Sequence, residues 1–394
     1  MKIWYFCLDP SPSSTNLQYA PSIHIAETIR ALQEQGHEVH HFLYGDVPNR
    51  GRDAVRQRSQ AIMSKYCLLD GLRPFLRDGY ELYRNVHDRS LIEQIFETNT
   101  IDLVYERLFY NNASVSAYTR RHQIPLIVES NAPAQERRQY WGSPLFFLTK
   151  RLEKEILQRA DAITVVSTPL KRHYERLGIP AKKVFVLPNG VNENLFSPRN
   201  ITRDVRAELG LSNQVILGFV GNIHTYHGVE LFLPLAREFK SGQYDLHFLV
   251  VGAGLGRSEL ISGLARENLD GLFTFVDPLP NSEIPTYIAA MDICLLPKFM
   301  WYGSPMKIFE YGAMGKAIIA PDLENIRDVL ANGRTALLFE PDSIPALIKA
   351  IRDLLSDIRL LRDLGNAVQK YILANHTWTR NAEKIAEIYN QVTH

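Results

Sequence analysis

The stretch YGSPMKIFEYGAMGKAIIAPD, residues 302–322, combines residue types that can bind an anion. Gly303 and Ser304 are small enough to let the backbone approach a ligand, and Pro305 suits the first turn of a helix. The backbone amides of residues 304–307 would then be unpaired donors at the positive end of that helix. Because Lys307 adds a cation on the same turn, the segment predicts a site for an anion such as a diphosphate.

A carboxylate follows this lysine on the same face of the expected helix. Glu310 comes three residues after Lys307, a spacing that makes the two side chains neighbours. Two vicinal hydroxyls, such as those of a ribose, could donate hydrogen bonds to it. A capped helix with a solvated Lys307–Glu310 contact would contain the same residues, so the segment alone leaves both interpretations open.

The elements that must position this segment alternate between strands and helices. Residues 2–8 and 38–44 have the composition of strands, and residues 23–35 between them keep helical spacing. Strand–helix–strand units of this kind imply a parallel sheet. The same alternation returns along residues 102–107, 125–130 and 162–177.

A second alternating series begins after the turn at Asn189-Gly190 and a polar segment around Pro198. We therefore predict an α/β chain with two Rossmann-like, doubly wound domains, 1–195 and 196–375, and a C-terminal helix in 376–394. Ligands bind at the carboxyl ends of parallel strands, so the two sheets are expected to face a central cleft. The loops within residues 219–228, 275–280 and 295–307 would lie at the rim of the second sheet.

Bulk composition excludes several classes of protein. The 394 residues are 45% hydrophobic and 22% charged, which is typical of globular domains. The net charge of +1 gives no field that would attract nucleic acid, so no such partner is expected. Cys7, Cys67 and Cys294 are far apart, as in a reducing compartment. No signal sequence and no run of ~18 apolar residues is present, and the expected location is the cytoplasm.

Two sequence features suggest a cofactor or a metal ion, but neither matches the pattern that such a site requires. The glycines in residues 252–256 follow a strand, but a dinucleotide fingerprint needs its third glycine at the position of Arg257. We interpret them as a tight turn. Alternation along a strand places His40 and His41 on opposite faces, and neither HExxH nor a Cys/His quartet occurs. We therefore expect no metal site and no cofactor.

Several blocks of the sequence resemble one family, in the order that the family has. Residues 302–339, from YGSPMKIFEYG to RTALLF, resemble the signature region of the retaining nucleotide-sugar glycosyltransferases of the GT-B fold, family 4. Each block alone would be a weak signal, but together they cover nearly the whole chain. The further blocks are residues 27–39, 160–191, 218–236, 273–297 and the helix that begins at Thr377-Trp378.

By this resemblance, the second domain binds a nucleoside diphosphate sugar and the C-terminal helix crosses back onto the first domain. Glu310 corresponds to the second glutamate of the family's signature pair and would hold the ribose hydroxyls. The other donor-side positions that the resemblance implies are Gly221 under the phosphates, Val276 to Leu279 along the base, and the backbone of Gly303, Ser304, Pro305 and Met306 facing the diphosphate or the sugar.

The chain departs from the family's pattern at three donor-side positions. The first glutamate of the signature pair falls on Tyr302, which puts the usual contact to the donor sugar in doubt. A lysine and an arginine of the family's glycine loop fall on His227 and Asn222, so two cations are lost from the diphosphate site. Lys307 and Lys298 are the candidates to replace them.

The first domain is expected to bind the acceptor. The polar side chains that follow its strands and could reach the cleft are Glu106, Arg107, Glu129, Asn131 and Glu136. Each of them could instead cap a helix. Residues 50–84 and 136–151 are basic and aromatic, and could either dock on an anionic membrane or form a solvated helix face.

These observations predict a metal-independent, retaining hexosyltransferase with Lys307 and Glu310 as catalytic residues. It would move a sugar from a UDP- or GDP-sugar to a hydroxyl of a sugar, lipid-linked or small-molecule acceptor, in polysaccharide, glycolipid or glycoconjugate synthesis. A nucleotide-sugar epimerase is one alternative, against which the SPMK block and the terminal tryptophan helix argue. A non-catalytic binding or regulatory subunit is the other, motivated by Tyr302, Asn222 and His227.

Overall fold

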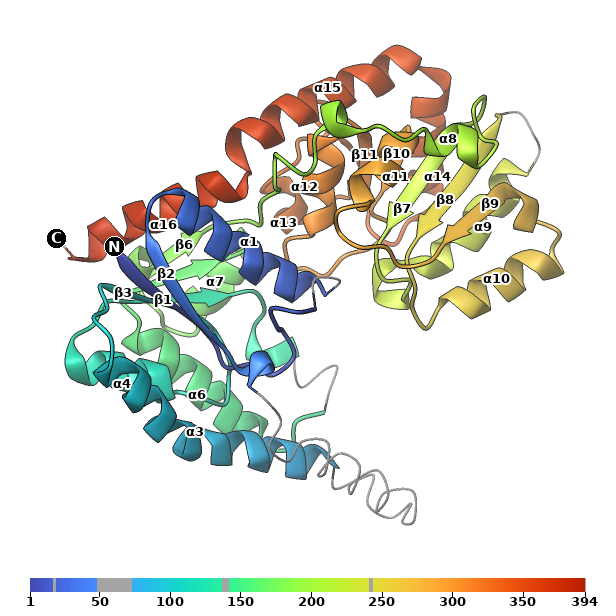
Figure 1. Ribbon diagram of the computed structural model, residues 1–394. Helices are drawn as coiled ribbons and strands as arrows, with labels where there is room; N and C mark the ends of the chain where they lie inside the picture. Colours follow the sequence, from blue (N-terminus) through green and yellow to red (C-terminus); the bar gives the residue numbers. More distant parts are fainter. Residues whose placement is uncertain (17–18, 48–72, 137–141, 241–243, 394) are drawn as a thin grey trace. The chain divides into compact units, whose positions relative to one another are not determined.

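The computed structural model describes residues 1–16, 19–47, 73–136, 142–240 and 244–393. The chain divides into two compact units (Figure 1). Unit 1 consists of Met1–Val166, Leu170–Leu187 and Ala382–His394, and unit 2 of Ser167–Pro169 and Pro188–Asn381. Cys7 and Cys294 are buried free thiols, whereas Cys67 lies outside the described residues.

Unit 1 is built on a six-stranded parallel sheet in the order β2-β1-β3-β4-β5-β6. Every residue of β4 and β5 is buried, as expected where helices cover both faces of a parallel sheet. The strands are β1 (Lys2–Cys7), β2 (Glu38–Leu43), β3 (Leu103–Arg107), β4 (Leu126–Ser130), β5 (Ala162–Val165) and β6 (Val184–Val186).

The helices of unit 1 follow its strands along the chain. The first helix has Pro21 in its first turn, and Gly36 follows its end with a positive φ, as the sequence predicts. The helices and 3-10 turns are α1 (Ala20–Glu34), η1 (Tyr44–Asp46), α3 (Arg73–Glu97), α4 (Ser114–His122), α6 (Phe146–Arg159), α7 (Thr168–Arg176) and η3 (Ala181–Lys183). The last helix, α16 (Trp378–Thr393), begins in unit 2 and belongs to unit 1 from Ala382 onward.

Unit 2 has a second six-stranded parallel sheet, in the order β12-β11-β10-β7-β8-β9. Its strands are β7 (Val215–Val220), β8 (Leu246–Val251), β9 (Phe273–Val276), β10 (Ile293–Leu295), β11 (Ala317–Pro321) and β12 (Leu337–Phe339). Its helices are α8 (Val205–Glu208), α9 (Phe232–Phe239), α10 (Arg257–Arg266), α11 (Ile284–Ala290), α12 (Met306–Ala313), α13 (Glu324–Arg327), α14 (Ile344–Ser356) and α15 (Ile358–Asn375), with 3-10 turns η4 (Pro198–Asn200), η5 (Thr225–His227), η6 (Val229–Leu231) and η7 (Asp270–Leu272). The predicted α/β class with two doubly wound sheets is confirmed.

Each face of the unit 2 sheet buries its own apolar core. Along β8, Leu249 and Val251 pack into one cluster, and Phe248 and Val250 pack into the other, because successive strand residues point to opposite faces. Residues of α12 and α15 complete the first cluster, and residues of α9 and α14 complete the second. The sheet is therefore held rigidly beneath the loops at its carboxyl edge.

The segment after β6 packs with unit 2 earlier than the sequence suggests. We predicted the domain boundary after residue 195, but the chain of unit 2 already resumes at Pro188. Val191 forms an isolated β-bridge with Thr377, and Asn189 donates two hydrogen bonds to Ser304. These contacts draw residues 188–195 into unit 2.

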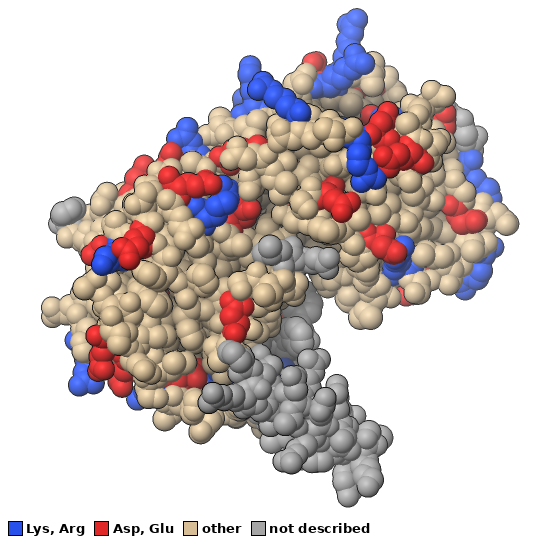
Figure 2. All heavy atoms as spheres, in the orientation of Figure 1, with Lys and Arg blue, Asp and Glu red and all other residues tan. Residues whose placement is uncertain are grey.

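Charged side chains of both signs are spread over the surface. On the face shown in Figure 2, Lys and Arg are interspersed with Asp and Glu, in keeping with the net charge of +1. This face does not carry the single-sign field that favours nucleic acid. Within the described ranges, no helix is long and apolar enough to cross a membrane.

The glycines after β8 serve close packing. A Cβ at Gly252, where φ is +135°, would lie 2.1 Å from the carbonyl oxygen of Gly221. A Cβ at Gly254, where φ is +158°, would lie 2.2 Å from the carbonyl oxygen of Ile223. The turn at 252–256 thus packs against the loop after β7, which supports the tight-turn interpretation over a dinucleotide site.

Replacing Gly252 by alanine should destabilise the protein by at least about 2 kcal/mol, because the new Cβ would overlap backbone atoms at a left-handed φ. Gly271→Ala is the matched control, since no atom lies within 4 Å of its Cβ position. Thermal denaturation should show a lowered midpoint for Gly252→Ala alone. Equal midpoints for the two variants would contradict the close packing of the two loops.

Candidate functional site

The strand order of unit 2 points to one edge of its sheet. Chain order reverses between β10 and β7, and ligands of doubly wound sheets bind outside the carboxyl ends of strands at such a reversal. The loop 221–228 follows β7, and the loop 296–305 follows β10 and leads into α12. The predicted donor-side residues lie on these two loops, at the start of α12 and just after β9.

The amine of Lys307 forms no ion pair with any of the described residues. Its Nζ is buried, has no hydrogen-bond partner among the described residues, and lies 4.3 Å from the centroid of the Phe219 ring. A Cβ at Gly221, where φ is +133°, would lie 3.1 Å from this Nζ, so a side chain there would crowd the amine and strain the backbone. Burial lowers the pKa of Lys307 to about 7, against the opposing attraction of Glu310.

The interpretation of Lys307 and Glu310 as a solvated surface contact is therefore wrong. Within the described part of the chain no ion pair joins them, and neither has another charged partner within salt-bridge distance. Glu310 is half-buried, and burial raises its pKa to about 7 while Lys307 opposes the rise. An anion near Nζ and hydroxyls near the carboxylate would compensate both groups.

The start of α12 presents unpaired backbone donors. The helix begins at Met306 after Pro305, and neither a side-chain cap nor an acidic residue occupies its first turn. In the described part of the chain, no acceptor is bonded to the N–H groups of Gly303, Ser304, Met306 and Lys307. These donors and the positive end of the helix favour an anion at the same place as Lys307.

The positions that depart from the family pattern do not restore the missing cations. Burial, the charge of Lys307 and that of His224 lower the pKa of His227 to about 2, so its ring is neutral. Asn222 donates to the hydroxyl of Tyr226 at 2.8 Å. Lys298 lies 3.7 Å from a carboxylate oxygen of Glu230 and 3.5 Å from one of Asp342, so its charge is compensated.

Three further donor-side residues have structural contacts of their own. Tyr302 is buried, and its ring packs edge-on against Trp301 with the centroids 5.4 Å apart. Val276 and Leu279 are half-buried at and after the end of β9 and pack against the core. The carbonyl of Val276 accepts a hydrogen bond from the N–H of Gly252, which links this segment to the glycine turn.

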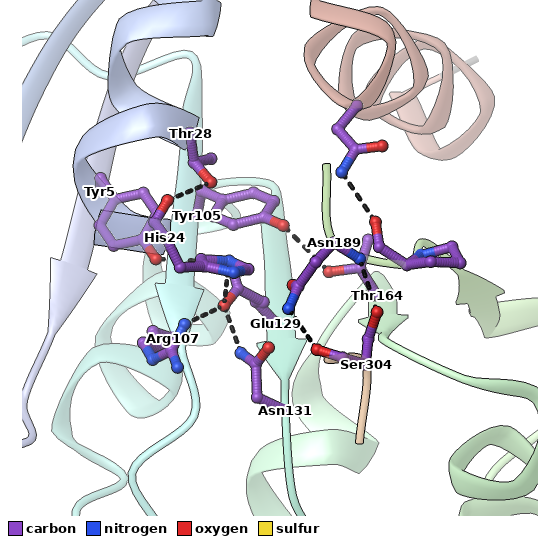
Figure 3. Close-up of polar contacts among 12 residues, drawn as sticks. Tyr5, His24, Thr28, Tyr105, Arg107, Glu129, Asn131, Thr164, Asn189 and Ser304 are labelled. Carbon is purple, nitrogen blue, oxygen red and sulfur yellow. Dashed lines mark hydrogen bonds and ion pairs between the residues drawn. The ribbon is translucent and has the colours of Figure 1, made fainter. Parts of the chain in front are cut away.

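In unit 1, the predicted acceptor-side residues Arg107, Glu129 and Asn131 meet in one polar cluster (Figure 3). Arg107 donates to Oε1 of Glu129 at 2.6 Å, Asn131 donates to the same oxygen, and His24 of α1 lies 2.9 Å from it. Burial alone would raise the pKa of Glu129, but the charges of His24 and Arg107 hold it down at about 2. The hydroxyl of Tyr5 donates to the other oxygen at 3.4 Å.

Glu106 does not join this cluster, contrary to the expectation that it reaches a ligand. Adjacent residues of β3 point to opposite faces, so Glu106 lies across the sheet from Arg107. Its side chain is fully buried, and neither carboxylate oxygen has a partner among the described residues. Burial raises the pKa of Glu106 to about 8. Glu136 is buried as well.

Sequence reasoning missed several polar residues at these sites. His24 stands in a helix that was recognised only by its apolar spacing, and nothing in the spacing relates it to Glu129. Asn189 was read as part of a turn, and Asn325 passed unnoticed inside a family-like block. Asn189 and Asn325 both donate to the loop before α12. Among the described residues no group of three or more His, Cys, Asp or Glu could hold a metal ion.

Solved structures with the same fold span the whole chain. Sucrose-phosphate synthase from Thermosynechococcus elongatus has a TM-score of 0.70 at 20% identity and covers 100% of this chain and 99% of its own. Anabaena Alr3699/HepE in complex with UDP has a TM-score of 0.72 at 16% identity, with coverage of 99% and 100%. These likenesses show the GT-B fold of sugar transferases.

Family comparisons identify the family within this class. Residues 22–195 match the family described as Glycosyltransferase Family 4, and residues 214–357 match Glycosyl transferases group 1. The two ranges together span more than half of the chain, which belongs to the GT-B glycosyltransferases of family 4. The alpha-maltose-1-phosphate synthase of Mycolicibacterium smegmatis is 28% identical over 263 residues, 61% of this chain. The chain spans 57% to 66% of the length of three such relatives.

Replacing Glu129 by glutamine and replacing Glu106 by glutamine should have different effects on the stability of the protein. Glu129→Gln leaves Arg107 buried without its counter-charge and should destabilise the protein by about 3–5 kcal/mol at pH 7. Glu106→Gln should not destabilise it, because a carboxyl with a pKa of about 8 is already uncharged at pH 7. Denaturant unfolding of the wild type and both variants between pH 3 and pH 8 measures these differences.

The pH dependence fixes the sign of each effect. Glu106 ionises in the unfolded chain near its ordinary pKa of 4.5 but stays protonated in the fold, so wild type should lose stability relative to Glu106→Gln from pH 5 to pH 8. The fold lowers the pKa of Glu129 from its ordinary value of 4.5. The stability that wild type gains over Glu129→Gln should therefore fade as the pH falls below about 4.5. The same pH trend for both variants would refute this assignment.

Proposed function

We propose that the chain is a retaining glycosyltransferase that moves a sugar from a nucleoside diphosphate donor to a hydroxyl acceptor, without a metal ion. One observation carries the donor class: the uncompensated Lys307 amine at the start of α12, one helical turn from Glu310. A diphosphate would supply the missing counter-charge, and a ribose would supply hydroxyls for the carboxylate. Support comes from Alr3699/HepE, which has been solved with UDP and with UDP-glucose.

In the proposed reaction, the bond between the anomeric carbon and the leaving phosphate oxygen breaks while the acceptor oxygen bonds on the same face. The acceptor proton passes to an oxygen of the leaving diphosphate, so no separate base is needed. Lys307 and the free N–H groups before and within the first turn of α12 stabilise the charge that develops on the phosphate. Glu310 holds the nucleotide in place, and positioning supplies much of the acceleration.

We assign acceptor binding to unit 1, through Arg107 and Asn131 beside Glu129. An acceptor attached to a lipid fits exposed aromatic side chains on α3 and α6, among them Tyr80, Tyr83 and Phe147, which could rest on a membrane surface. Residues 48–72 and 137–141, which hold much of the basic sequence behind that expectation, lie outside the described residues. The reaction is assigned to the cytoplasm as part of the same proposal.

A non-catalytic nucleotide-binding subunit is the second candidate. It is favoured by Tyr302, which replaces a donor-sugar ligand with a buried ring, and by the neutral ring of His227. Such a subunit would bind a nucleotide through Lys307 and never turn it over. Slow hydrolysis of a nucleotide sugar in the absence of acceptor distinguishes the transferase from this subunit.

Nucleotide binding should depend on Lys307 and Glu310. We expect one of UDP, GDP and ADP, or a sugar derivative, to raise the melting temperature of wild type in the presence of EDTA, and Glu310→Ala to abolish the shift. Lys307→Met should weaken binding about 10- to 100-fold in calorimetry, the loss of a charged hydrogen bond. Lys298→Met, the matched control, should have a smaller effect because Glu230 and Asp342 compensate Lys298. Failure of every nucleotide to bind wild type would overturn the proposal.

Affinity for the nucleoside diphosphate should peak near pH 7. The carboxyl of Glu310, with its pKa raised to about 7, must be ionised, and the amine of Lys307, with its pKa lowered to about 7, must be protonated. Glu310→Gln should flatten the acidic limb and Lys307→Met the basic limb. Titration of the nucleotide itself is common to all three proteins and cancels in their ratios. A profile that both substitutions leave unchanged would show that these groups do not titrate at the site.

A further inference from the structure

Side chains hold the backbone carbonyls of the loop before α12. Nδ2 of Asn325 donates to the carbonyl oxygen of Met300 at 2.9 Å and to that of Gly303 at 2.7 Å. Both hydrogens of its amide are thereby used within one loop. Asn325 is 2% exposed, and its buried Oδ1 has no partner in the part of the chain that the structure describes. The two hydrogen bonds that Asn325 donates fix its position, although a buried acceptor without a partner costs stability.

Two more side chains donate hydrogen bonds to carbonyls of the same loop, those of Tyr302 and Ser304. Oγ of Ser167 donates to the carbonyl oxygen of Tyr302 at 2.6 Å, and Nδ2 of Asn189 donates to that of Ser304 at 2.7 Å (Figure 3 shows the second bond). Ser167 is fully buried, and it belongs to the short segment Ser167–Pro169, which packs with unit 2 and includes the first residues of α7. Side chains from three other segments of the chain thus bond to residues 300–304 of the loop before α12.

A hydrogen bond to a backbone carbonyl also sets the direction of the N–H group in the same peptide plane. The chain contains no cis peptide bond among its described residues, so each C=O points opposite to the N–H of the following residue. When Ser167 holds the carbonyl of Tyr302, the N–H of Gly303 points away from Ser167. When Asn325 holds the carbonyl of Gly303, the N–H of Ser304 points away from Asn325. Both N–H groups are among those left without an acceptor.

From this arrangement we infer that Asn325 and Ser167 are positioning residues for the diphosphate of the donor. They fix two peptide planes so that the N–H groups, and not the carbonyl oxygens, face the anion beside Lys307. A flipped plane would turn a carbonyl dipole toward the phosphate and repel it. The inference rests on the proposed function, since it assigns to Asn325 and Ser167 the role of holding the loop and not the nucleotide.

Affinity for a nucleoside diphosphate, compared with affinity for its nucleoside, tests the inference. Ser167→Ala and Asn325→Ala should each weaken binding of UDP about 10-fold, or of GDP or ADP where wild type selects that base, and leave binding of the matching nucleoside unchanged. Ser167→Thr keeps the hydroxyl and should restore the diphosphate affinity. Gln369→Ala is the control: it removes a side-chain bond to the carbonyl of Ala313 at the other end of α12, and should change neither affinity.

The outcomes separate this inference from the proposed function. If wild type binds no nucleotide, the donor site itself is refuted and the inference falls with it. If wild type binds but the variants lose nucleoside and diphosphate affinity equally, or Gln369→Ala behaves like them, the donor site stands and the positioning role is overturned. Ser167→Ala and Ser167→Thr decide the matter by themselves if Asn325→Ala does not fold.

Discussion

The buried amine of Lys307, which lies over the ring of Phe219 and has no hydrogen-bond partner among the described residues, is the constraint on which the geometry of unit 2 depends. A cation over an aromatic ring gains up to about 2 kcal/mol, whereas removing an ammonium from water costs several. The unliganded fold therefore carries an unfavourable interaction. Its effects reach the neighbours: Lys307 helps to keep His227 neutral, and a side chain at position 221 would crowd the amine. An anion would relieve all of these effects together.

The fold tolerates that interaction because its cost is confined to one edge of a rigid sheet. A separate apolar core packs on each face of the unit 2 sheet, and this packing holds the strands next to Lys307 in place. Gly221 and Gly252 bring two loops into backbone contact directly after the strands end. Lys307 is one exception to polar compensation, at the place where these loops meet α12, and such exceptions are expected at functional sites.

Sequence patterns predicted the two sheets because each buried strand or helix records its neighbours in its own periodicity. They also located Lys307 and Glu310, whose spacing is local. They could not predict contacts between residues far apart in the chain: Ser167 and Tyr302 are 135 positions apart, and Asn325 and Gly303 are 22 apart. The pairing of Lys298 with Glu230 and Asp342, which removes it as a free cation, is equally non-local. Glu106 was misjudged for a different reason, because a position at the end of a strand does not say which face the side chain takes.

The candidate sites of the two units differ in charge compensation, and this difference affects which kind of ligand each could bind. In unit 1, Arg107 and Glu129 neutralise each other, and Asn131 and Tyr5 complete the hydrogen bonds of the carboxylate. A cluster so compensated has little to gain from a charged ligand, but its remaining N–H groups and hydroxyls can bond a neutral one. In unit 2, the amine of Lys307 and the N–H groups at the start of α12 have no partner among the described residues, so this unit gains most from an anion. The proposal of an anionic donor in unit 2 and an uncharged hydroxyl acceptor at unit 1 rests on this electrostatic contrast.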